Sequence, residues 1–155
     1  MQTRKATIQD KAVVLKILDD FRADCMEQIT GEQCESTSAR DGGSKVFETL
    51  LARDDYAIFV LESPENEVVG IITGYLCPML RNGGNRAEVE EFFLQKAHRG
   101  GGNAVALMDA FFEWCKEKKV AKVNLESENG LDRAHSFYKK YGFETKAQRF
   151  IKKLS

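Results

Sequence analysis

A run of three glycines, Gly100 to Gly102, stands directly before an apolar helical pattern in the stretch AHRGGGNAVALMDAFFEW (97–114). Glycine at a helix start costs backbone entropy, about 1 kcal/mol for each residue. Such a run is typical of a backbone that a ligand must approach closely. Residues 87–95, before the run, have the pattern of a strand. A strand, a glycine loop and a helix N-terminus present free N–H groups and a positive dipole end, which predicts an anion site suited to pyrophosphate.

The rest of the chain alternates between the periods of helices and strands. Helices are predicted over 10–28, 45–53, 103–118 and 132–141, and strands over 3–7, 56–62, 68–76, 87–95, 121–127 and 148–154. Three strands in a meander, followed by a strand–helix–strand unit, predict an α/β (α+β) fold with a mixed central sheet and helices on both faces. The polar segment 30–44 is predicted to be a mobile loop.

Length and composition limit the class of protein. The 155 residues suit one domain over 1–155, and 43% hydrophobic with 30% charged residues is ordinary for a globular chain. Apolar runs stay below the ~18 residues of a membrane helix, and the N-terminus lacks a signal-peptide core, so we expect a cytoplasmic protein without a membrane partner. The four cysteines and two histidines lack zinc-ligand spacing, so no metal is expected. A net charge of −1 without a basic stripe argues against nucleic acid as a partner.

The glycine run can be compared with known cofactor loops. Val105 breaks the dinucleotide pattern G-x-G-x-x-G, and no G-K-[ST] follows as in a P-loop. Arg99, Gly102 and Ala104 do match R-x-x-G-x-A. Together with the later segment AHSFYKKYGF (134–143), this motif resembles the GNAT superfamily of acetyl-CoA-dependent N-acetyltransferases, over nearly the whole chain. The resemblance implies the GNAT fold and acetyl-CoA as co-substrate.

The resemblance also implies where the cofactor binds. The pantetheine arm would lie along the strand that ends at Leu94, and the pyrophosphate would receive the backbone amides of residues 100–105. Most members carry Asn where this chain has Leu131, and Asn129 lies nearby at a different spacing. The expected cofactor-binding residues are Phe92, Phe93, Leu94, Arg99, Gly100, Gly101, Gly102, Asn103, Ala104, Val105 and Asn129.

Catalysis by such an enzyme needs a base, an acid and an oxyanion donor. An amine with a pKa near 10.4 is almost fully protonated at pH 7, so a base helps. Glu90 and Glu91 are adjacent on the strand, so only one can face the cleft; the alternative is one solvated and one lysine-paired carboxylate. By resemblance, Tyr138 gives its proton to the departing CoA thiolate; the alternative is a tyrosine packed in the core. A backbone N–H near Leu94 would face the thioester carbonyl.

The acceptor would lie between the segment 30–44 and the hairpin 78–86. Acidic residues are frequent near this wall, namely Asp20, Asp24, Glu27, Glu32 and Glu35. Such a wall suits a small cationic amine: a polyamine, an aminoglycoside or an amino-acid-like molecule. The alternatives are a protein or peptide amine, a GNAT module that binds acyl-CoA without catalysis, and a nucleotide-binding domain for NAD. Many GNAT members pair through their C-terminal strands, which allows for a homodimer here.

Overall fold

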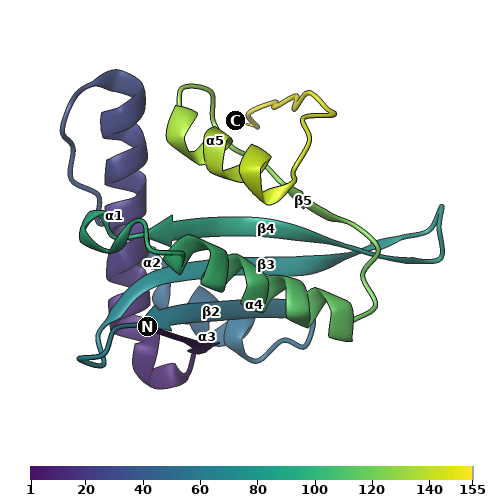
Figure 1. The fold of residues 1–155 in the computed structure, drawn as a ribbon, viewed down its shortest axis with the longest axis horizontal. Coiled ribbons are helices and arrows are strands. Elements are labelled where there is room, and N and C mark those ends of the chain that lie inside the picture. The colour runs from purple at the N-terminus through teal and green to yellow at the C-terminus, as the bar shows by residue number, and fades with distance from the viewer. Residues whose placement is uncertain (155) are drawn as a thin grey trace.

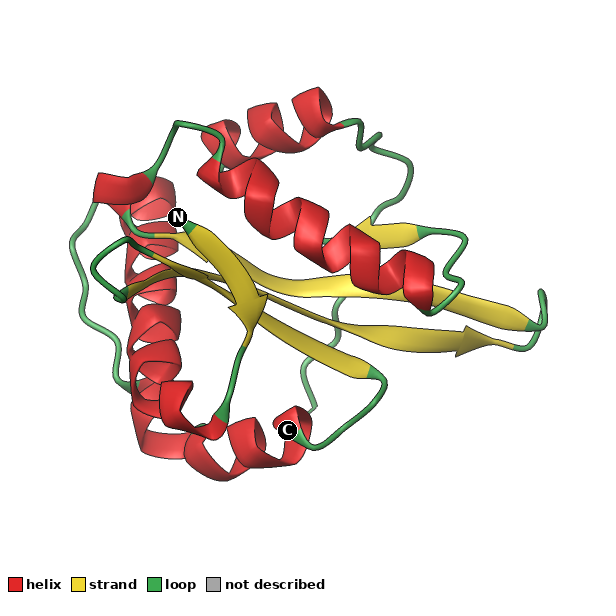
Figure 2. Ribbon diagram, turned by 60° about the horizontal axis from the view of Figure 1, so that its bottom comes forward, coloured by secondary structure: helices red, strands yellow, loops and turns green. Residues whose placement is uncertain are grey.

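The structure is a computed structural model that describes residues 1–154 (Figure 1). Within these residues five strands form one sheet, and helices pack on both of its faces (Figure 2). The strands are β1 (Gln2–Lys5), β2 (Tyr56–Glu62), β3 (Val68–Met79), β4 (Gly84–Leu94) and β5 (Val123–Leu125). The helices are α1 (Lys11–Thr30), α2 (Ser38–Gly42), α3 (Ser44–Leu51), α4 (Asn103–Glu117) and α5 (Asp132–Tyr141), with short 3-10 helices η1 (Ile8–Asp10) and η2 (Lys96–His98). The predicted mixed α/β fold is confirmed.

The order of the strands creates an opening at one end of β4. The sheet runs β1-β2-β3-β4-β5, and its first four strands pair antiparallel. β5 pairs parallel to β4 from Ala87↔Val123 to Val89↔Leu125. β4 continues to Leu94 beyond this pairing, so the two strands part after Val89, on the side of β4 that leads to the glycine loop. In Figure 1 this is the end of β4 that points toward α1, below α5.

Each face of the sheet has its own apolar core. One core joins α1 and α3 to the sheet and includes Val14, Ile17, Phe47, Ile58, Val60, Ile71 and Phe93. The other joins α4 to the sheet and includes Phe59, Leu61, Ile72, Leu107, Met108, Phe111 and Trp114. At Gly74 in β3, an added Cβ would lie 2.6 Å from the Phe111 ring. Glycine is therefore required there for α4 to pack closely on the sheet.

The predicted strand over 148–154 is wrong. Residues 143–154 form neither a helix nor a strand, and the side chains of Phe150, Ile151 and Leu154 are between 70% and 89% exposed. Alternating apolar residues form a strand only where a sheet edge pairs with them. β5 is three residues long and offers little edge, and this tail instead reaches the segment after β5 through an ion pair between Arg149 and Glu126.

The segment 30–44 is more ordered than the sequence suggests, because it contains α2. Asp19 on α1 is 3% exposed and accepts hydrogen bonds from the backbone N–H of Ala39 (2.9 Å) and from Nε of Arg40 (2.8 Å). These bonds fix α2 to α1. The hairpin of β3 and β4 is also longer than predicted, so that only residues 80–83 form its turn.

None of the helices in 1–154 combines the length and the apolar character needed to cross a membrane. No group of three or more His, Cys, Asp or Glu side chains within the same residues is placed to hold a metal ion.

Candidate active site

A cleft of about 420 Å³ opens where β4 and β5 part. Its walls are the C-terminal half of α1, the end of β4, the glycine loop and the start of α5; Figure 1 shows α5 above β4, beside the upper end of α1. The expected site residues that line the cleft are Glu90, Phe92, Phe93, Leu94, Arg99, Gly100, Gly102, Ala104, Val105 and Tyr138. The fold thus brings the glycine loop and the late tyrosine motif to one space. Glu91, Gly101, Asn103 and Asn129 lie outside this lining.

The glycine loop owes its composition to its backbone conformation. Gly100, Gly101 and Gly102 have φ angles of +97°, +58° and +83°, in the left-handed region that side chains with a Cβ rarely adopt. A Cβ built on each of them would meet nothing within 4 Å, so the space above the loop is open. Gly102 is the N-cap of α4, and the Asn103 amide closes the turn by donating to the His98 carbonyl (2.9 Å). The backbone N–H of Asn103 donates to the Gly100 carbonyl (3.2 Å), so the next N–H groups of the first turn, those of Ala104 and Val105, are the ones left for an anion.

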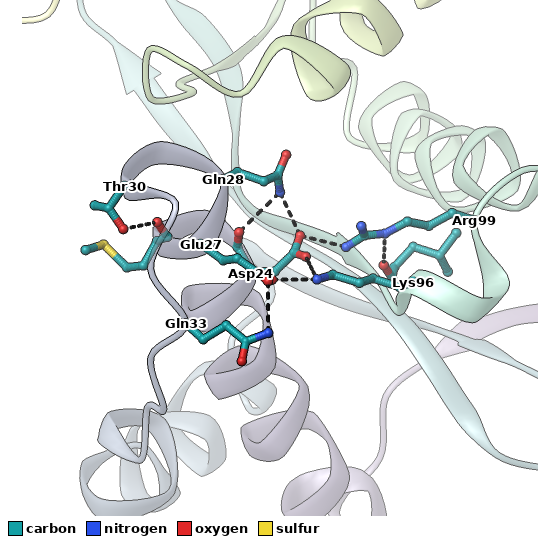
Figure 3. Close-up of polar contacts among 9 residues, drawn as sticks. Asp24, Glu27, Gln28, Thr30, Gln33, Lys96 and Arg99 are labelled. Atoms are coloured by element: carbon teal, nitrogen blue, oxygen red, sulfur yellow. Dashed lines mark hydrogen bonds and ion pairs between the residues drawn. The ribbon is translucent and has the colours of Figure 1, made fainter.

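Contacts with other residues of the protein fix the side chain of Arg99. Its Nε donates to the carbonyl oxygen of Leu94 (2.7 Å), and its Nη2 donates to the carboxylate of Asp24 on α1 (2.7 Å; Figure 3). The guanidinium carbon lies 5.2 Å from the centre of the Phe93 ring. Arg99 lines the cleft, as expected of a cofactor-binding residue, but its charge is already paired with a buried carboxylate.

Leu131, which stands at the position of the family's asparagine, and the expected cofactor-binding residue Asn129 lie differently. Leu131 is 7% exposed and lines the cleft. Asn129 is exposed and stands outside the lining. Leu131 therefore puts an apolar group where most family members have an amide, and Asn129 does not replace that amide in this conformation.

Tyr138 reaches the cleft from α5 through an aromatic cluster. Its ring packs near Phe92 and Phe137, with centroids 6.3 and 5.8 Å away, and near Phe143 at 5.9 Å. Burial, with a smaller contribution from Cys25 on α1, raises the pKa of Tyr138 to about 12. The phenol therefore keeps its proton at neutral pH. No hydrogen bond ties the hydroxyl to another residue within 1–154, which leaves it free to donate into the cleft.

A β-bulge separates the two adjacent glutamates. Thr73 of β3 pairs with Glu91 and the next residue, Gly74, pairs with Val89, which leaves Glu90 as the extra residue of β4. Glu90 lines the cleft. Glu91 turns to the face covered by α1 and α3, where its carboxyl accepts a hydrogen bond from the Thr73 hydroxyl. The expectation that one of the pair faces the cleft is met by Glu90.

Glu91 sits in a buried polar cluster. The Thr73 hydroxyl that donates to it is itself 3.4 Å from the Tyr56 hydroxyl, and the Tyr56 ring stacks on Tyr75. Burial, followed by the nearby charge of Glu90, raises the pKa of Glu91 to about 7. The carboxyl is therefore neutral below about pH 7. Its ionisation above that pH costs free energy, because the charged form is buried.

A Glu91→Gln variant is expected to gain stability over the wild type as pH rises. Because the folded-state pKa of Glu91 lies above the ordinary value of 4.5, wild-type stability falls between pH 4.5 and about 7, while the glutamine is neutral throughout. The gain should be about 2 to 3 kcal/mol of unfolding free energy between pH 5 and pH 8. Urea unfolding of both proteins at the two pH values measures it. A difference between the proteins that is the same at both pH values would contradict the raised pKa.

The residues of this site fall within a region that matches a known protein family. A family model described as "Acetyltransferase (GNAT) family" matches residues 18–143, which include the glycine loop and Tyr138. The chain belongs to the GNAT acetyltransferase family. GNAT members use acetyl-CoA as the acyl donor, and membership makes this chain an N-acetyltransferase. Comparison with curated protein sequences gives no match.

Solved structures share the GNAT fold over the whole length. An aminoglycoside acetyltransferase from an uncultured soil metagenomic sample has a TM-score of 0.74 at 21% identity, covering 99% of this chain and 98% of that one. A ribosomal-protein-alanine N-acetyltransferase from Brucella melitensis biovar Abortus has a TM-score of 0.72 at 16% identity, with the same two coverages. A transcriptional regulator from Bacillus halodurans has a TM-score of 0.80 at 20% identity, covering 99% of both chains. At such identities the likeness concerns the fold alone.

Arg133 is a residue of this GNAT site that the sequence reasoning missed. It stands in the first turn of α5 and lines the cleft, and no carboxylate within 1–154 pairs with it. Partial burial and the nearby charge of Arg99 lower the pKa of Arg133 from its ordinary value. A partly buried cation near a second cation favours an anionic ligand, although the charge of Asp24 acts in the opposite direction here. Its position directly before Ala134 of the late motif was the signal that could have found it.

Proposed function

We propose that this GNAT enzyme transfers the acetyl group of acetyl-CoA to a primary amine of a small cationic molecule, such as a polyamine, an aminoglycoside or an amino-acid-like amine. The observation that carries the proposal is that the glycine loop, the end of β4 and Tyr138 line one cleft. The loop offers an anion site, the strand offers an unpaired backbone edge, and the tyrosine offers a proton. Acyl transfer from a thioester uses all three.

The residues of the cleft fit acetyl-CoA in charge and shape. The first-turn N–H groups of α4 and the guanidinium of Arg133 would hold the diphosphate. The backbone of residues 92–94 has no β5 beside it, so its free edge could pair with the pantetheine amides as an added strand does. Bound in this way, acetyl-CoA supplies an activated acyl group. The oxyanion donor near Leu94 stays a prediction.

Glu90 and Tyr138 would divide the proton transfers. Glu90 lines the cleft and would take a proton from the acceptor ammonium, which frees the nitrogen lone pair for attack. As the N–C bond forms and the C–S bond breaks, Tyr138 would give its proton to the departing sulfur. The new amide nitrogen still carries one extra proton, which would pass to the Tyr138 phenolate and restore the tyrosine, while the first amine proton leaves Glu90 for solvent.

The acceptor class is supported by a second recess, of about 560 Å³, beside the cleft. Asp24 and Phe93 line both spaces, so the two adjoin. The carboxylates that line the recess are those of Asp20, Asp24, Glu27 and Glu35, whereas Glu32 stands outside its lining. Lys96 also lines the recess and pairs with Asp24 and Glu27, and Lys16 pairs with Asp20. Glu35 is thus the lining carboxylate without an ion pair in the described residues, and it would favour a cationic ligand. The aminoglycoside acetyltransferase among the structural neighbours agrees with this class.

The test is release of CoA thiol from acetyl-CoA, with polyamines, aminoglycosides, amino acids and lysine peptides in separate reactions. We expect release with one of the small cationic classes. Release with lysine peptides alone would favour a protein amine. Binding of acetyl-CoA without release in any reaction would favour a GNAT module without catalysis. A melting temperature raised by NAD and unchanged by acetyl-CoA would overturn the cofactor assignment.

The remaining expectations, about cellular location and partners, stay predictions. They are a cytoplasmic location, no nucleic-acid or membrane partner, and a homodimer. Many GNAT members pair through their C-terminal strands, but the segment 148–154 forms no strand in the single chain. Light scattering of the purified protein would measure the oligomeric state.

A further inference from the structure

A buried carboxylate on α1 holds the start of the glycine loop. Asp24 is 7% exposed and contacts groups that follow β4 in the chain. Its carboxylate accepts a hydrogen bond from Arg99 (2.7 Å) and lies 3.2 Å from Nζ of Lys96, while the Gln28 amide donates to it from the next turn of α1 (2.8 Å; Figure 3). Asp24 therefore joins α1 to the turn between β4 and the glycine loop.

Arg99 connects Asp24 to the glycine loop and to β4. Its side chain is 15% exposed, and its remaining contacts are the Leu94 carbonyl, at the last residue of β4, and the face of the Phe93 ring. Arg99 directly precedes Gly100 in the chain. A displacement of its guanidinium would therefore shift both the end of the strand and the first glycine.

The loop has few other restraints. Three successive glycines with positive φ angles and no neighbours within 4 Å of their Cβ positions have little packing to hold them. At the helix end, the Asn103 side chain fixes the turn through the His98 carbonyl. At the strand end, the pair of Arg99 and Asp24 is the restraint with the least exposure to solvent. The geometry of this ion pair should therefore determine the direction in which the backbone N–H groups of the glycine loop point.

The same carboxylate lies in the wall shared by the cleft and the acidic recess. A second ion pair, between Lys96 and Glu27 (2.6 Å), joins the two elements one turn further along α1. Phe21 packs on Phe93 with ring centroids 5.5 Å apart. These contacts join the C-terminal half of α1 to the segment before the glycine loop, so the two should move together.

We propose that Asp24 is a positioning residue for acetyl-CoA: through Arg99 it fixes the glycine loop in the conformation that receives the diphosphate, without touching the cofactor itself. This inference rests on the function proposed above. It assigns Arg99 to the support of the loop, in place of direct contact with the cofactor.

The test compares acetyl-CoA affinity by calorimetry in the wild type and in Asp24→Asn, which removes the charge and keeps the shape. We expect the dissociation constant for acetyl-CoA to rise by about 10- to 100-fold. Asp19→Asn is the matched control, because Asp19 is also a buried α1 carboxylate paired with an arginine, Arg40, but lies away from the cleft. It should lower the melting temperature while leaving acetyl-CoA affinity within about two-fold.

A double variant, Asp24→Asn with Arg99→Gln, keeps the test informative if the single variant folds poorly. It replaces the ion pair with a neutral amide pair that can still bond to the Leu94 carbonyl, so it should fold and recover part of the lost affinity. Unchanged or tighter binding by Asp24→Asn would overturn the inference, because a freed Arg99 would then be acting on the cofactor directly. A wild type that does not bind acetyl-CoA would instead refute the proposed function.

Discussion

Replacing Tyr138 with phenylalanine is expected to lower kcat by about 10²- to 10⁴-fold and to leave the dissociation constant for acetyl-CoA within about two-fold. The hydroxyl has no other partner within 1–154, and its raised pKa keeps it protonated. Its loss therefore removes a proton donor without breaking a structural bond, while the ring keeps its contacts with Phe92 and Phe137. Steady-state kinetics with the acceptor found in the amine screen, together with calorimetry, measure the two effects.

Tyr141→Phe is the matched control for this prediction. Tyr141 lies one turn further along α5, and its hydroxyl donates to Asp109 on α4 (2.6 Å), outside the cleft. Its loss should cost a little stability and leave kcat unchanged. If Tyr138→Phe also turned over at the wild-type rate, Tyr138 would be a packing residue and the proton would come from elsewhere.

Placing a negative charge at position 105 is expected to weaken acetyl-CoA binding by at least about 100-fold. Val105 is the third residue of α4, is 41% exposed and lines the cleft. Glutamate is favourable in the first turn of a helix, so Val105→Glu should fold at least as stably as the wild type. Next to a bound diphosphate, however, two like charges about 5 Å apart at a dielectric constant of about 20 repel by roughly 3 kcal/mol.

Val105→Gln separates charge from size in this experiment. Glutamine has the shape of glutamate without its charge, so its effect on acetyl-CoA affinity should be within a few-fold. Calorimetry at low ionic strength gives the comparison, and added salt should narrow the gap between the two variants. Equal affinities for the Glu and Gln variants would mean that the diphosphate binds away from the start of α4.

The parts of the site that the sequence predicted well are those with local causes. The glycine run and the start of α4 follow from neighbouring residues, and Tyr138 belongs to one compact motif. The roles of Glu90 and Glu91 could not be separated in this way, because simple alternation does not reveal a bulge. That bulge lies opposite Gly74, where α4 packs against the sheet through Phe111, far along the chain.

Other features depended on partners that sequence spacing does not reveal. Arg99 matched a cofactor motif, but the carboxylate that holds it lies 75 positions away on α1. The short helix α2 depends on Asp19 in the same manner. The tail 148–154 has the alternation of a strand and lacks an adequate edge to pair with. Patterns in the sequence thus located residues that line the cleft, and long-range contacts determine how those residues are supported.

Mass spectrometry after incubation with acetyl-CoA tests the central claim most directly. The intact protein and a mixture of small cationic amines would be analysed from the same reaction. The account predicts one added acetyl group on an amine of the mixture, with the mass of the protein unchanged, because the acceptor attacks the thioester directly. An acetyl group found on the protein before any reaches an amine would contradict the account, and so would consumption of acetyl-CoA without acetylation of any amine.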